Sequence, residues 1–449
     1  MNKNDLVELE IEGMTHNGYG VGKLNGFAIF VPNTAIGDKI LAKILKVHKT
    51  YAYGKIDNII CPSKSRIEND CEVYLKCGGC VYRHISYEQE LEIKRDLVKN
   101  AFSKIAGLTL NVLPVIACQN INEYRNKAQF PVGISNDNQV MIGFYSQASH
   151  NIIDIEQCKI QDTAFSKIIK IIREWIKQNN ISIYKEQTNK GLLRHIYLRT
   201  GKKTGDIMVC LVINGDEINK KTRLIQALTE NIPQIKSIIL NINKKPSNVI
   251  LGQKCITIWG KNYIEDILQD LHFNISVLSF YQVNPEQTEK LYEKAMELCD
   301  FKSNETVLDL YCGIGTISLF LATKAKQVFG VEIVKEAVED AKSNAKLNNI
   351  ENVEFFEGDA LKAANMLAEQ GIKPDIIVID PPRKGCESSL IDTIVQMKPK
   401  KIVYISCDPA TLARDVKLLF EKGYSTNEVQ PVDMFPRTAH CECVILMSM

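Results

Sequence analysis

Long apolar runs are absent from this chain of 449 residues. No stretch approaches the about 20 uncharged apolar residues that a membrane-spanning helix needs. The first residues, MNKNDLVELEIEG, carry charges where a secretory signal peptide needs an apolar core. These absences predict a cytoplasmic protein that has no membrane partner.

A strong net charge is also lacking, since the formal value is +2 at pH 7. A balance this small does not attract nucleic acid through bulk electrostatics, so any RNA binding must depend on local basic patches. We find no internal repeat and no low-complexity linker. The hydrophobic content of 45% and charged content of 24% are ordinary for a soluble globular protein.

Cysteine, by contrast, occurs at 14 positions. In a long chain without a signal peptide, this number argues against a disulfide framework. It favours metal binding or catalysis by some of the thiols.

Three regions follow one another along the chain, whose length suits two to four domains. Residues 1–60 alternate in the β manner between glycine turns, which predicts a small OB-like β-barrel. Residues 61–275 indicate a central α+β domain. Its helical pattern near 86–106, capped by Ser86 facing Gln89, is a candidate to pack on the catalytic domain.

The C-terminal region, residues 276–449, has regular βα units from about residue 303. Strands alternating with helices of ten or more residues predict a parallel, doubly wound, Rossmann-like sheet, so the fold class is α/β. The expected strands cover residues 306–312, 327–333, 353–359, 375–382 and 401–409, with a last pair near 425–432 and 444–447.

A glycine turn after the first of these strands is a candidate cofactor site. Its sequence, D-L-Y-C-G-I-G-T, begins at Asp309 and lets the backbone approach a ligand closely. A nucleotide-phosphate site is the alternative for such a turn. Glu332 ends the next strand, 23 residues after Asp309, where an acid can accept both ribose hydroxyls of an adenosine. The turn lacks both a complete G-x-G-x-x-G and a P-loop lysine, which disfavours a pyrophosphate.

Two further strand ends carry reactive side chains. Asp380 precedes two prolines that fix an extended lip, which directs its carboxylate into the cleft. Cys407 lies at the carboxyl end of the strand K-I-V-Y-I-S, where open α/β sheets bind their ligands. From this stretch alone, a buried structural cysteine remains the alternative to a nucleophile.

These motifs resemble known families. The segment G-M-T-H-N-G-Y-G-V-G-K-L-N-G resembles a TRAM domain, an OB-type RNA-binding barrel. The series D-x-Y-C-G-x-G-T, V-E-I, G-D and D-P-P-R resembles class I S-adenosylmethionine-dependent methyltransferases. With S-C-D-P and F-P-R-T-A-H-C-E added, nearly the full chain resembles the RNA uracil-C5 methyltransferase family. Methyltransferases that act on amino groups normally carry an aromatic residue after the two prolines. Arg383 stands there in this chain, which points away from amino-group methylation and toward Cys407.

The resemblance assigns roles residue by residue. It implies that Cys407 adds to carbon 6 of uracil as a thiolate and that Glu442 removes the carbon-5 proton. A solvated acid on a final strand is the alternative for Glu442. For the methyl donor, S-adenosyl-L-methionine, the resemblance implies a set of binding residues: Gln282, Tyr311, Glu332, Asp380, Gly313 and, less regularly in the family, Thr316 and Asp359.

Four cysteines match a metal site by the same resemblance: Cys71, Cys77, Cys80 and Cys158. Three thiolates on one short loop and a fourth from elsewhere can hold a [4Fe–4S] cluster. Their spacing alone does not distinguish this cluster from zinc, which remains the alternative. The resemblance implies the iron–sulfur cluster, in a structural or RNA-contacting role.

RNA contacts are expected from two basic segments and one aromatic residue. Residues 190–203 contain five basic residues and no acid, and on a strand His195, Tyr197 and Arg199 share one face. A solvated strand face is the alternative. The candidate RNA-binding residues are Phe280, which could stack on or replace a flipped uracil, Arg125, Arg194 and Arg199.

The sequence therefore predicts a monomeric enzyme that methylates carbon 5 of one or two uridines in 23S ribosomal RNA. A transfer-RNA T-loop uracil-C5 methyltransferase is the second hypothesis. The TRAM-like barrel and the four cysteines favour the ribosomal branch, although some relatives outside bacteria that act on transfer RNA carry both features. A non-catalytic RNA-binding module is the third hypothesis, and it predicts loss of the nucleophile and base.

Overall fold

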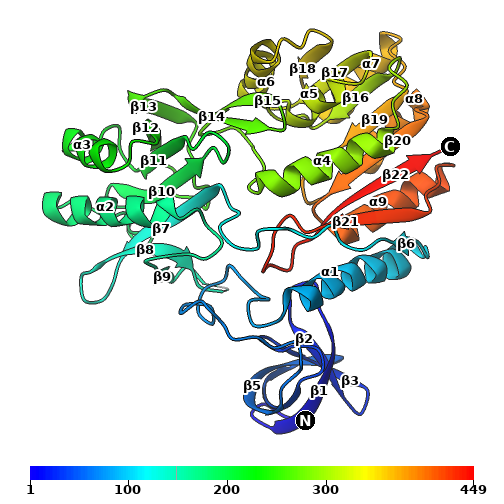
Figure 1. Ribbon diagram of the computed structural model, residues 1–449. Helices are drawn as coiled ribbons and strands as arrows, with labels where there is room; N and C mark the ends of the chain where they lie inside the picture. The colour runs from blue at the N-terminus through cyan, green and yellow to red at the C-terminus, as the bar shows by residue number, and fades with distance from the viewer. Residues whose placement is uncertain (148) are drawn as a thin grey trace.

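The computed structural model describes residues 1–147 and 149–449, which form three lobes (Figure 1). The N-terminal lobe is a closed barrel with the strand order β1-β2-β3-β5-β4. Alternate residues such as Ile11, Ile29 and Val31 point inward and leave no exposed surface or almost none. The predicted small barrel is therefore confirmed. Its strands are β1 (Leu6–Met14), β2 (Gly20–Leu24), β3 (Phe27–Val31), β4 (Lys39–Val47) and β5 (Tyr51–Cys61).

The segment after the barrel joins two lobes. Helix α1 (Tyr87–Ala101) begins where the Ser86 side chain accepts a hydrogen bond from the Gln89 amide, and it ends in a π-helical turn, Phe102–Ala106. Strand β6 (Asn111–Val112) then pairs in parallel with β21 of the C-terminal sheet. Helix α1 and β6 therefore lie with the C-terminal lobe.

The central lobe is built on a seven-stranded sheet with the order β13-β12-β11-β10-β7-β8-β9. Helices α2 and α3 pack on one face of it, and the hairpin β14-β15 leads to the third lobe (Figure 1). Its elements are β7 (Lys127–Ile134), β8 (Val140–Tyr145), β9 (Ile152–Asp154), α2 (Ala164–Asn179), β10 (Leu193–Thr200), β11 (Ile207–Ile213), α3 (Lys221–Asn231), β12 (Ile235–Ile242), β13 (Lys254–Gly260), β14 (Tyr263–Leu268) and β15 (Leu271–Ser276).

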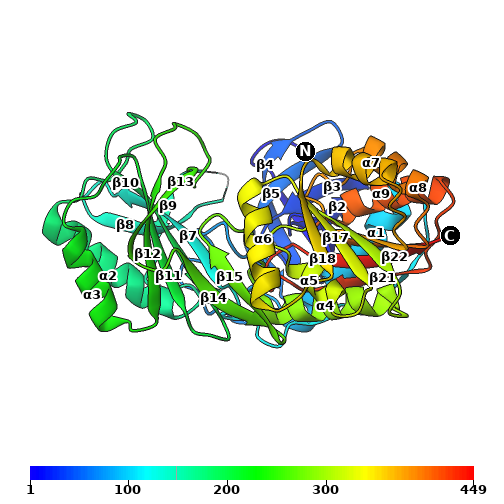
Figure 2. The ribbon, with the colours of Figure 1, turned by 90° about the horizontal axis from the view of Figure 1, so that it is seen from above.

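The C-terminal lobe is an eight-stranded sheet with the order β18-β17-β16-β19-β20-β22-β21-β6. Its strands and helices alternate as predicted: α4 (Pro285–Cys299), β16 (Thr306–Leu310), α5 (Thr316–Ala322), β17 (Gln327–Glu332), α6 (Lys335–Leu347), β18 (Val353–Glu357), α7 (Ala360–Glu369), β19 (Ile376–Ile379), α8 (Ser388–Met397), β20 (Lys401–Ser406), α9 (Pro409–Glu421), β21 (Glu428–Val432) and β22 (Glu442–Ser448). Helices α4, α5 and α6 cover one face, and α7, α8, α9 and α1 cover the other (Figure 2).

One part of the sheet prediction is wrong. Strands β18 to β20 are parallel, but β22 runs antiparallel to both β20 and β21. The short connection between β21 and β22 has no helix, so β22 cannot return to the starting edge as a parallel strand must. The amino end of β22 therefore lies at the carboxyl ends of the parallel strands.

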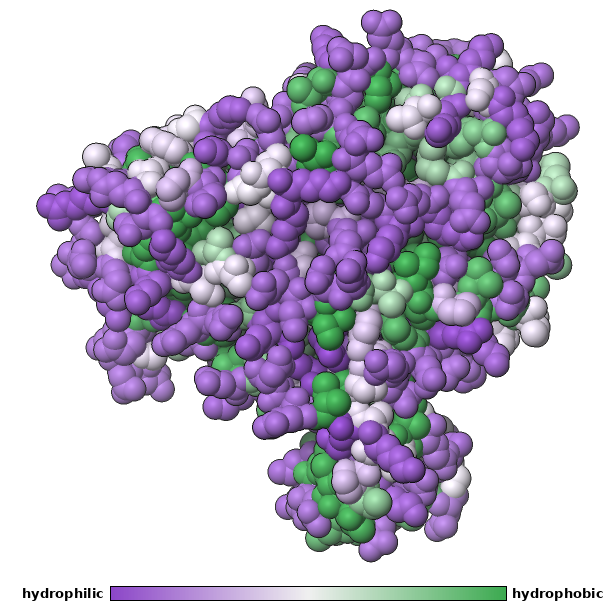
Figure 3. Space-filling model, viewed as in Figure 1, coloured by the Kyte–Doolittle hydropathy of each residue, from purple (hydrophilic) through white to green (hydrophobic). Residues whose placement is uncertain are grey.

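The molecular surface is mainly polar. In Figure 3, hydrophilic residues cover most of the viewed face, and the barrel protrudes as a separate lobe. Within residues 1–147 and 149–449, no helix is long and apolar enough to span a membrane.

Candidate active site

Cys407 and Glu442 face each other across two neighbouring strands. Ser406 of β20 pairs with Cys443 of β22 in the antiparallel register. Cys407 directly follows Ser406, and Glu442 directly precedes Cys443. The charge of Glu442 acts on Cys407, so the two residues lie close together. Asp380 follows the adjacent strand β19, and its negative charge acts on both of them. The topology thus brings a thiol and two carboxyl groups to one edge of the sheet.

This edge disfavours ionised acids. Burial raises the pKa of Asp380 to about 7. Burial, followed by the charges of Asp380 and Cys441, raises the pKa of Glu442 well above its usual range. Burial, and then Glu442 and Asp380, raise the pKa of Cys407 to about 11. A carboxyl group with a raised pKa is suited to exchange protons near neutral pH.

Two basic side chains border the edge, and the sequence interpretation gave neither a firm role. Arg383 acts against the raised pKa values of Cys407 and Glu442. Desolvation, and then Arg383, lower the pKa of His440 to about 4, so its ring is neutral. The His440 Nε2 lies 3.2 Å from an Arg383 nitrogen. The sequence feature that could have identified Arg383 is its place after the prolines, where amino-group methyltransferases carry an aromatic residue.

A helix cap fixes the turn that carries Cys407. The Asp408 carboxylate accepts hydrogen bonds from the amides of Ala410 and Thr411 at 2.8 and 3.1 Å and caps α9. The Ser406 hydroxyl donates to the Asp408 carbonyl at 3.1 Å. These bonds hold Cys407 between the strand and the helix with its thiol half-buried.

The glycine turn forms a second part of the site. The Glu332 carboxylate accepts hydrogen bonds from the amides of Gly313 and Val334 at 3.1 and 2.9 Å. A Cβ atom added at Gly313 would meet no atom within 4 Å, so this side of the turn is open. Tyr311 has a φ of 77°, and its amide donates to the carbonyl of Val331. Glu332 is therefore fixed beside an open stretch of backbone.

The remaining candidate cofactor residues lie around this turn with different partners. Thr316 begins α5, and its hydroxyl lies 3.0 Å from that of Tyr292. Asp359 follows β18 and caps α7 through the amides of Leu361 and Lys362. Those hydrogen bonds give Asp359 a structural task of its own at the same edge of the sheet.

Residues 276–284 connect the central lobe to α4 and carry Phe280 and Gln282. The Ser279 hydroxyl donates to Asp340 of α6 at 2.7 Å, which ties this segment to the helix that follows Glu332. The Asn126 side chain donates to the backbone carbonyl of Gln282 at 3.0 Å. The side-chain amide of Gln282 is half-buried and takes no part in this bond. Phe280 is 63% exposed and therefore does not pack in the core.

The expected basic strand face is wrong, and the correction concerns Arg194 and Arg199. Strand β10 lies in the middle of the central sheet, and all of its residues are buried. Arg199 donates to the carbonyls of Ser276 and Ser279 at 2.9 and 3.0 Å, and Arg194 donates to carbonyls of residues 243, 245 and 247. Both guanidinium groups therefore hold loops together instead of facing RNA.

The four candidate metal ligands, Cys71, Cys77, Cys80 and Cys158, line one cavity of about 260 Å³. Burial and, to a smaller extent, the three other thiols together raise the pKa of Cys80 to about 12, with Arg83 acting against them. Arg83, Arg125 and Lys127 line the same cavity. Among the residues that the structure describes, no three His, Cys, Asp or Glu side chains surround a single ion position.

Arg125 lies between this cavity and the active site. Its guanidinium carbon is 6.0 Å from the centre of the Phe435 ring, and its charge acts on His440. Phe435 and His440 belong to the connection that leads into Glu442. The one candidate RNA contact from this part of the chain thus neighbours the catalytic edge.

Comparisons with known proteins agree with this geometry. The profile of tRNA (uracil-5-)-methyltransferases matches residues 86–449, and that of the TRAM domain matches residues 3–56. An RNA methyltransferase of Clostridium tetani, described as uncharacterized, is 51% identical over 99% of this chain and 97% of its own length. A similarly described protein of Halalkalibacterium halodurans is 47% identical over 100% of this chain and 98% of its own length.

A solved structure also matches the full chain. It is the tRNA (uracil-54, C5)-methyltransferase of Pyrococcus abyssi in complex with S-adenosyl-L-homocysteine. The TM-score is 0.77 at 29% identity, over 98% of this chain and 99% of that protein. The resemblance inferred from the motifs is confirmed. The chain belongs to the tRNA (uracil-5-)-methyltransferase family, as an RNA methyltransferase with an N-terminal TRAM domain.

Proposed function

We propose that the protein, acting as a monomer, methylates carbon 5 of a uridine in 23S ribosomal RNA. The observation that carries the chemistry is the proximity of Cys407, Glu442 and Asp380 at one edge of the sheet, where both carboxyl groups act on the thiol. Carbon 5 of uracil is too weak a nucleophile to take a methyl group unaided. A thiol and a proton-accepting carboxyl on one side of a sheet edge meet the two needs of this reaction.

In the proposed reaction the Cys407 thiolate adds to carbon 6, and the electrons of the C5–C6 double bond form an enolate. Carbon 5 then takes a methyl group, and the C–S bond that held this group to a sulfonium donor breaks with its electron pair left on sulfur. Glu442 removes the proton from carbon 5, the C–H electrons restore the double bond, and the bond from carbon 6 to sulfur breaks. A thiolate is released readily, whereas an alkoxide from a serine would not be.

S-adenosylmethionine, the proposed donor, supplies a methyl group on a sulfonium when it is bound. The residues near the glycine turn fit it: Gly313 leaves its backbone open, and Glu332 can accept ribose hydroxyls while its N–H partners hold it in place. Ile333, 64% exposed beside Glu332, offers an apolar surface for an adenine. The proposed donor-binding residues remain Gln282, Tyr311, Gly313, Thr316, Glu332, Asp359 and Asp380.

The choice of RNA rests on different support. The family resemblance of the barrel together with the four cysteines favours 23S ribosomal RNA. The Pyrococcus abyssi enzyme, whose name gives uracil 54 of tRNA as its target, matches the same barrel and central lobe. Transfer RNA is therefore the second candidate.

Two surfaces would contact RNA. Phe280 and Arg125 lie on segments that enter the active-site region, where an extruded base would need stacking and phosphate contacts. On the barrel, Phe30, Tyr51 and Tyr53 form one aromatic group with ring centres 5.4 to 5.8 Å apart. Lys46 pairs with Tyr53 in register, and Lys43 pairs with Lys55 on the same sheet. Aromatic rings among lysines are typical of single-stranded RNA binding.

We further propose that the four-cysteine cavity holds a [4Fe–4S] cluster. The four thiols line one cavity, as the ligands of a cluster held by four cysteines must. A cluster binds each thiolate through a separate iron. The cations that line the cavity suit its negative charge, and the buried Nε of Arg83 has no other partner.

A trapping experiment tests the mechanism and the substrate together. RNA with 5-fluorouridine replaces the carbon-5 proton by fluorine, which Glu442 cannot remove, so the covalent adduct with Cys407 should accumulate in the presence of S-adenosylmethionine. The Cys407→Ala variant is the matched control and should form none. Absence of an adduct with the wild type would overturn the mechanism and would favour a non-catalytic RNA-binding role. Fragments of 23S RNA and transfer RNA, tried separately, identify the substrate.

Metal analysis tests the cluster independently of activity. Anaerobically purified protein should contain about four iron and four sulfide per chain, and Cys77→Ala should lose them. The exposed Cys61 lies outside the cavity, so Cys61→Ala should retain them. About one zinc per chain would contradict the proposal.

A further inference from the structure

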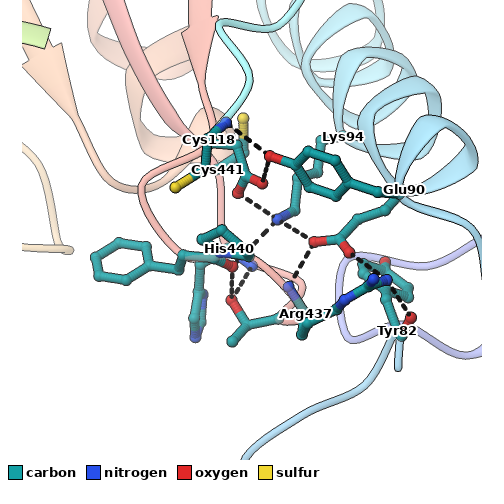
Figure 4. A network of polar contacts seen from close by, with 12 residues as sticks. Tyr82, Glu90, Lys94, Cys118, Arg437, His440 and Cys441 are labelled. Atoms are coloured by element: carbon teal, nitrogen blue, oxygen red, sulfur yellow. Dashed lines mark hydrogen bonds and ion pairs between the residues drawn. The ribbon is translucent and has the colours of Figure 1, made fainter. Parts of the chain in front are cut away.

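A network of buried charges joins α1 to the connection that leads into Glu442 (Figure 4). Lys94 donates to Glu90 at 2.7 Å and to Asp433 at 2.6 Å, and none of these three side chains is exposed. The Arg437 side chain lies 3.5 Å from the second Glu90 oxygen. Tyr87 donates to the other Asp433 oxygen at 2.7 Å. The two positive and two negative charges balance.

The same network fixes the backbone before Glu442. Five consecutive carbonyls, from residue 433 to 437, each accept a hydrogen bond from another element. The donors are Gln287 and Asn284 around the start of α4, Lys94, Tyr124, and the amides of Val81 and Tyr82. In addition, the amide of Arg437 donates to Glu90 at 2.7 Å. This segment has few conformations left to adopt.

The arrangement carries strain and a desolvation cost. Arg437 has a φ of 69°, which a residue with a side chain adopts only when its surroundings hold it there. Buried ion pairs seldom stabilise a fold more than apolar side chains of the same volume would. Although burial lowers the pKa of Lys94, Asp433 and Glu90 outweigh it and raise the value, so the ammonium stays charged. These buried charges therefore fix the position of residues 433–437 more than they stabilise the fold.

We propose that Lys94, with Glu90 and Asp433, is a positioning group that sets Glu442 against Cys407 for the elimination step. This inference rests on the proposed function. The fixed segment ends five residues before Glu442 in the sequence and contains Phe435, whose ring neighbours Arg125. Loss of the ammonium would release the carbonyl of Phe435 and leave two carboxylates to repel each other. Glu442 would then lose its register, while Cys407, on β20, would keep its own.

The test separates elimination from the earlier steps. With ordinary uridine RNA and S-adenosylmethionine, Lys94→Met should form the covalent adduct and transfer the methyl group at rates within about threefold of the wild type. Release of methylated RNA should slow at least about tenfold, so that a methylated protein–RNA adduct accumulates on denaturing gels. The KM for RNA should stay unchanged. Lys94→Arg, which retains the charge, should recover part of the release rate.

A double-mutant comparison distinguishes positioning from general damage. Because Lys94 is proposed to act through Glu442, adding Lys94→Met to Glu442→Gln should not slow release further. Arg173→Gln, which breaks an Arg173–Asp154 ion pair in the central lobe, is the control for a lost ion pair and should release RNA normally. Additive effects, or equal losses in all steps, would overturn the inference. Failure of the wild type to form any adduct would instead overturn the proposed function.

Discussion

Two groups of buried acids lie on either side of the same connection, and they differ in their partners. Around Lys94, Glu90 and Asp433 have short ion pairs on all sides. At the sheet edge, no ion pair to Asp380 or Glu442 is found among the described residues. Burial raises the pKa of each. Burial raises the pKa of Glu90 too, but Lys94 and Arg437 act against this rise and pair with its carboxylate. The second group can gain and lose protons, which is the property that a catalytic carboxyl needs.

The comparison teaches that burial alone does not identify a functional acid. Asp309 belongs with the second group: it is buried, one oxygen has no partner, the other accepts from Ser318, and burial raises its pKa to about 7. Proximity to a fixed cation is what separates the groups. Removing a carboxylate from the first group should therefore lower stability at all pH values. In the second group, the effect should fall on the chemistry or on the pH dependence of stability.

The largest expected effect is that of Glu442→Gln on turnover. Removal of a proton acceptor should slow the release of methylated RNA, and so turnover, about 10²- to 10⁴-fold, because carbon 5 keeps its proton and the adduct cannot resolve. Single-turnover assays that follow both methyl transfer and RNA release would measure this. A variant that turns over normally would exclude Glu442 as the base.

Glu90→Gln should lower the stability of the fold instead of slowing a chemical step. Removing one partner of a buried ion pair costs about 3–5 kcal/mol, because the other charge remains buried. Hydrogen exchange in α1 and β22 would report the loss, whereas Glu442→Gln should slow exchange in β22. Destabilisation by both variants would contradict the distinction between the two groups.

Asp309→Asn should stabilise the protein above neutral pH and have little effect near pH 4. Since burial raises the Asp309 pKa from 3.8 to about 7, the stability that this carboxyl contributes is complete below pH 4 and is lost as the pH rises to 7. The difference between variant and wild type should grow by about 1.4 kcal/mol per pH unit in this window. Thermal unfolding from pH 4 to 8 would measure it.

The smallest effect concerns the thiol. Because burial and two carboxylates raise the pKa of Cys407 to about 11, its alkylation should speed up about tenfold per pH unit between pH 7 and 10. Asp380→Asn should accelerate the reaction about three- to tenfold at pH 8. Mass spectrometry of the peptide containing Cys407, with the exposed Cys61 as reference, would follow this. An unchanged rate in Asp380→Asn would show that burial alone protects the thiol.

Local patterns predicted the parts of the site that depend on strand ends. Residues 401–409 correspond to β20, Lys401–Ser406, and its last residue lies directly before Cys407. Period and turn chemistry are local properties, so the glycine turn and Glu332 were also found. The barrel followed from alternation over short strands between glycine turns.

Properties that depend on distant contacts were missed. A lysine on an amphipathic helix such as α1 is ordinarily solvated, and no sequence signal distinguishes Lys94, which meets Asp433 from the far end of the chain. Arg199 was expected on a solvent-facing strand because the position of β10 within its sheet is not encoded locally. The antiparallel β22 was missed for the same reason.

The pairing of β6 with β21 has a consequence for the order of synthesis. Val112 cannot pair until Val429 has been synthesised, because these residues are register partners at the sheet edge. The barrel is complete at Cys61 and the central sheet at Gly260, so both can fold before the C-terminal lobe, residues 276–449, has left the ribosome. Catalytic competence then arises in one late event, when β21 and β22 emerge and complete the sheet with β6.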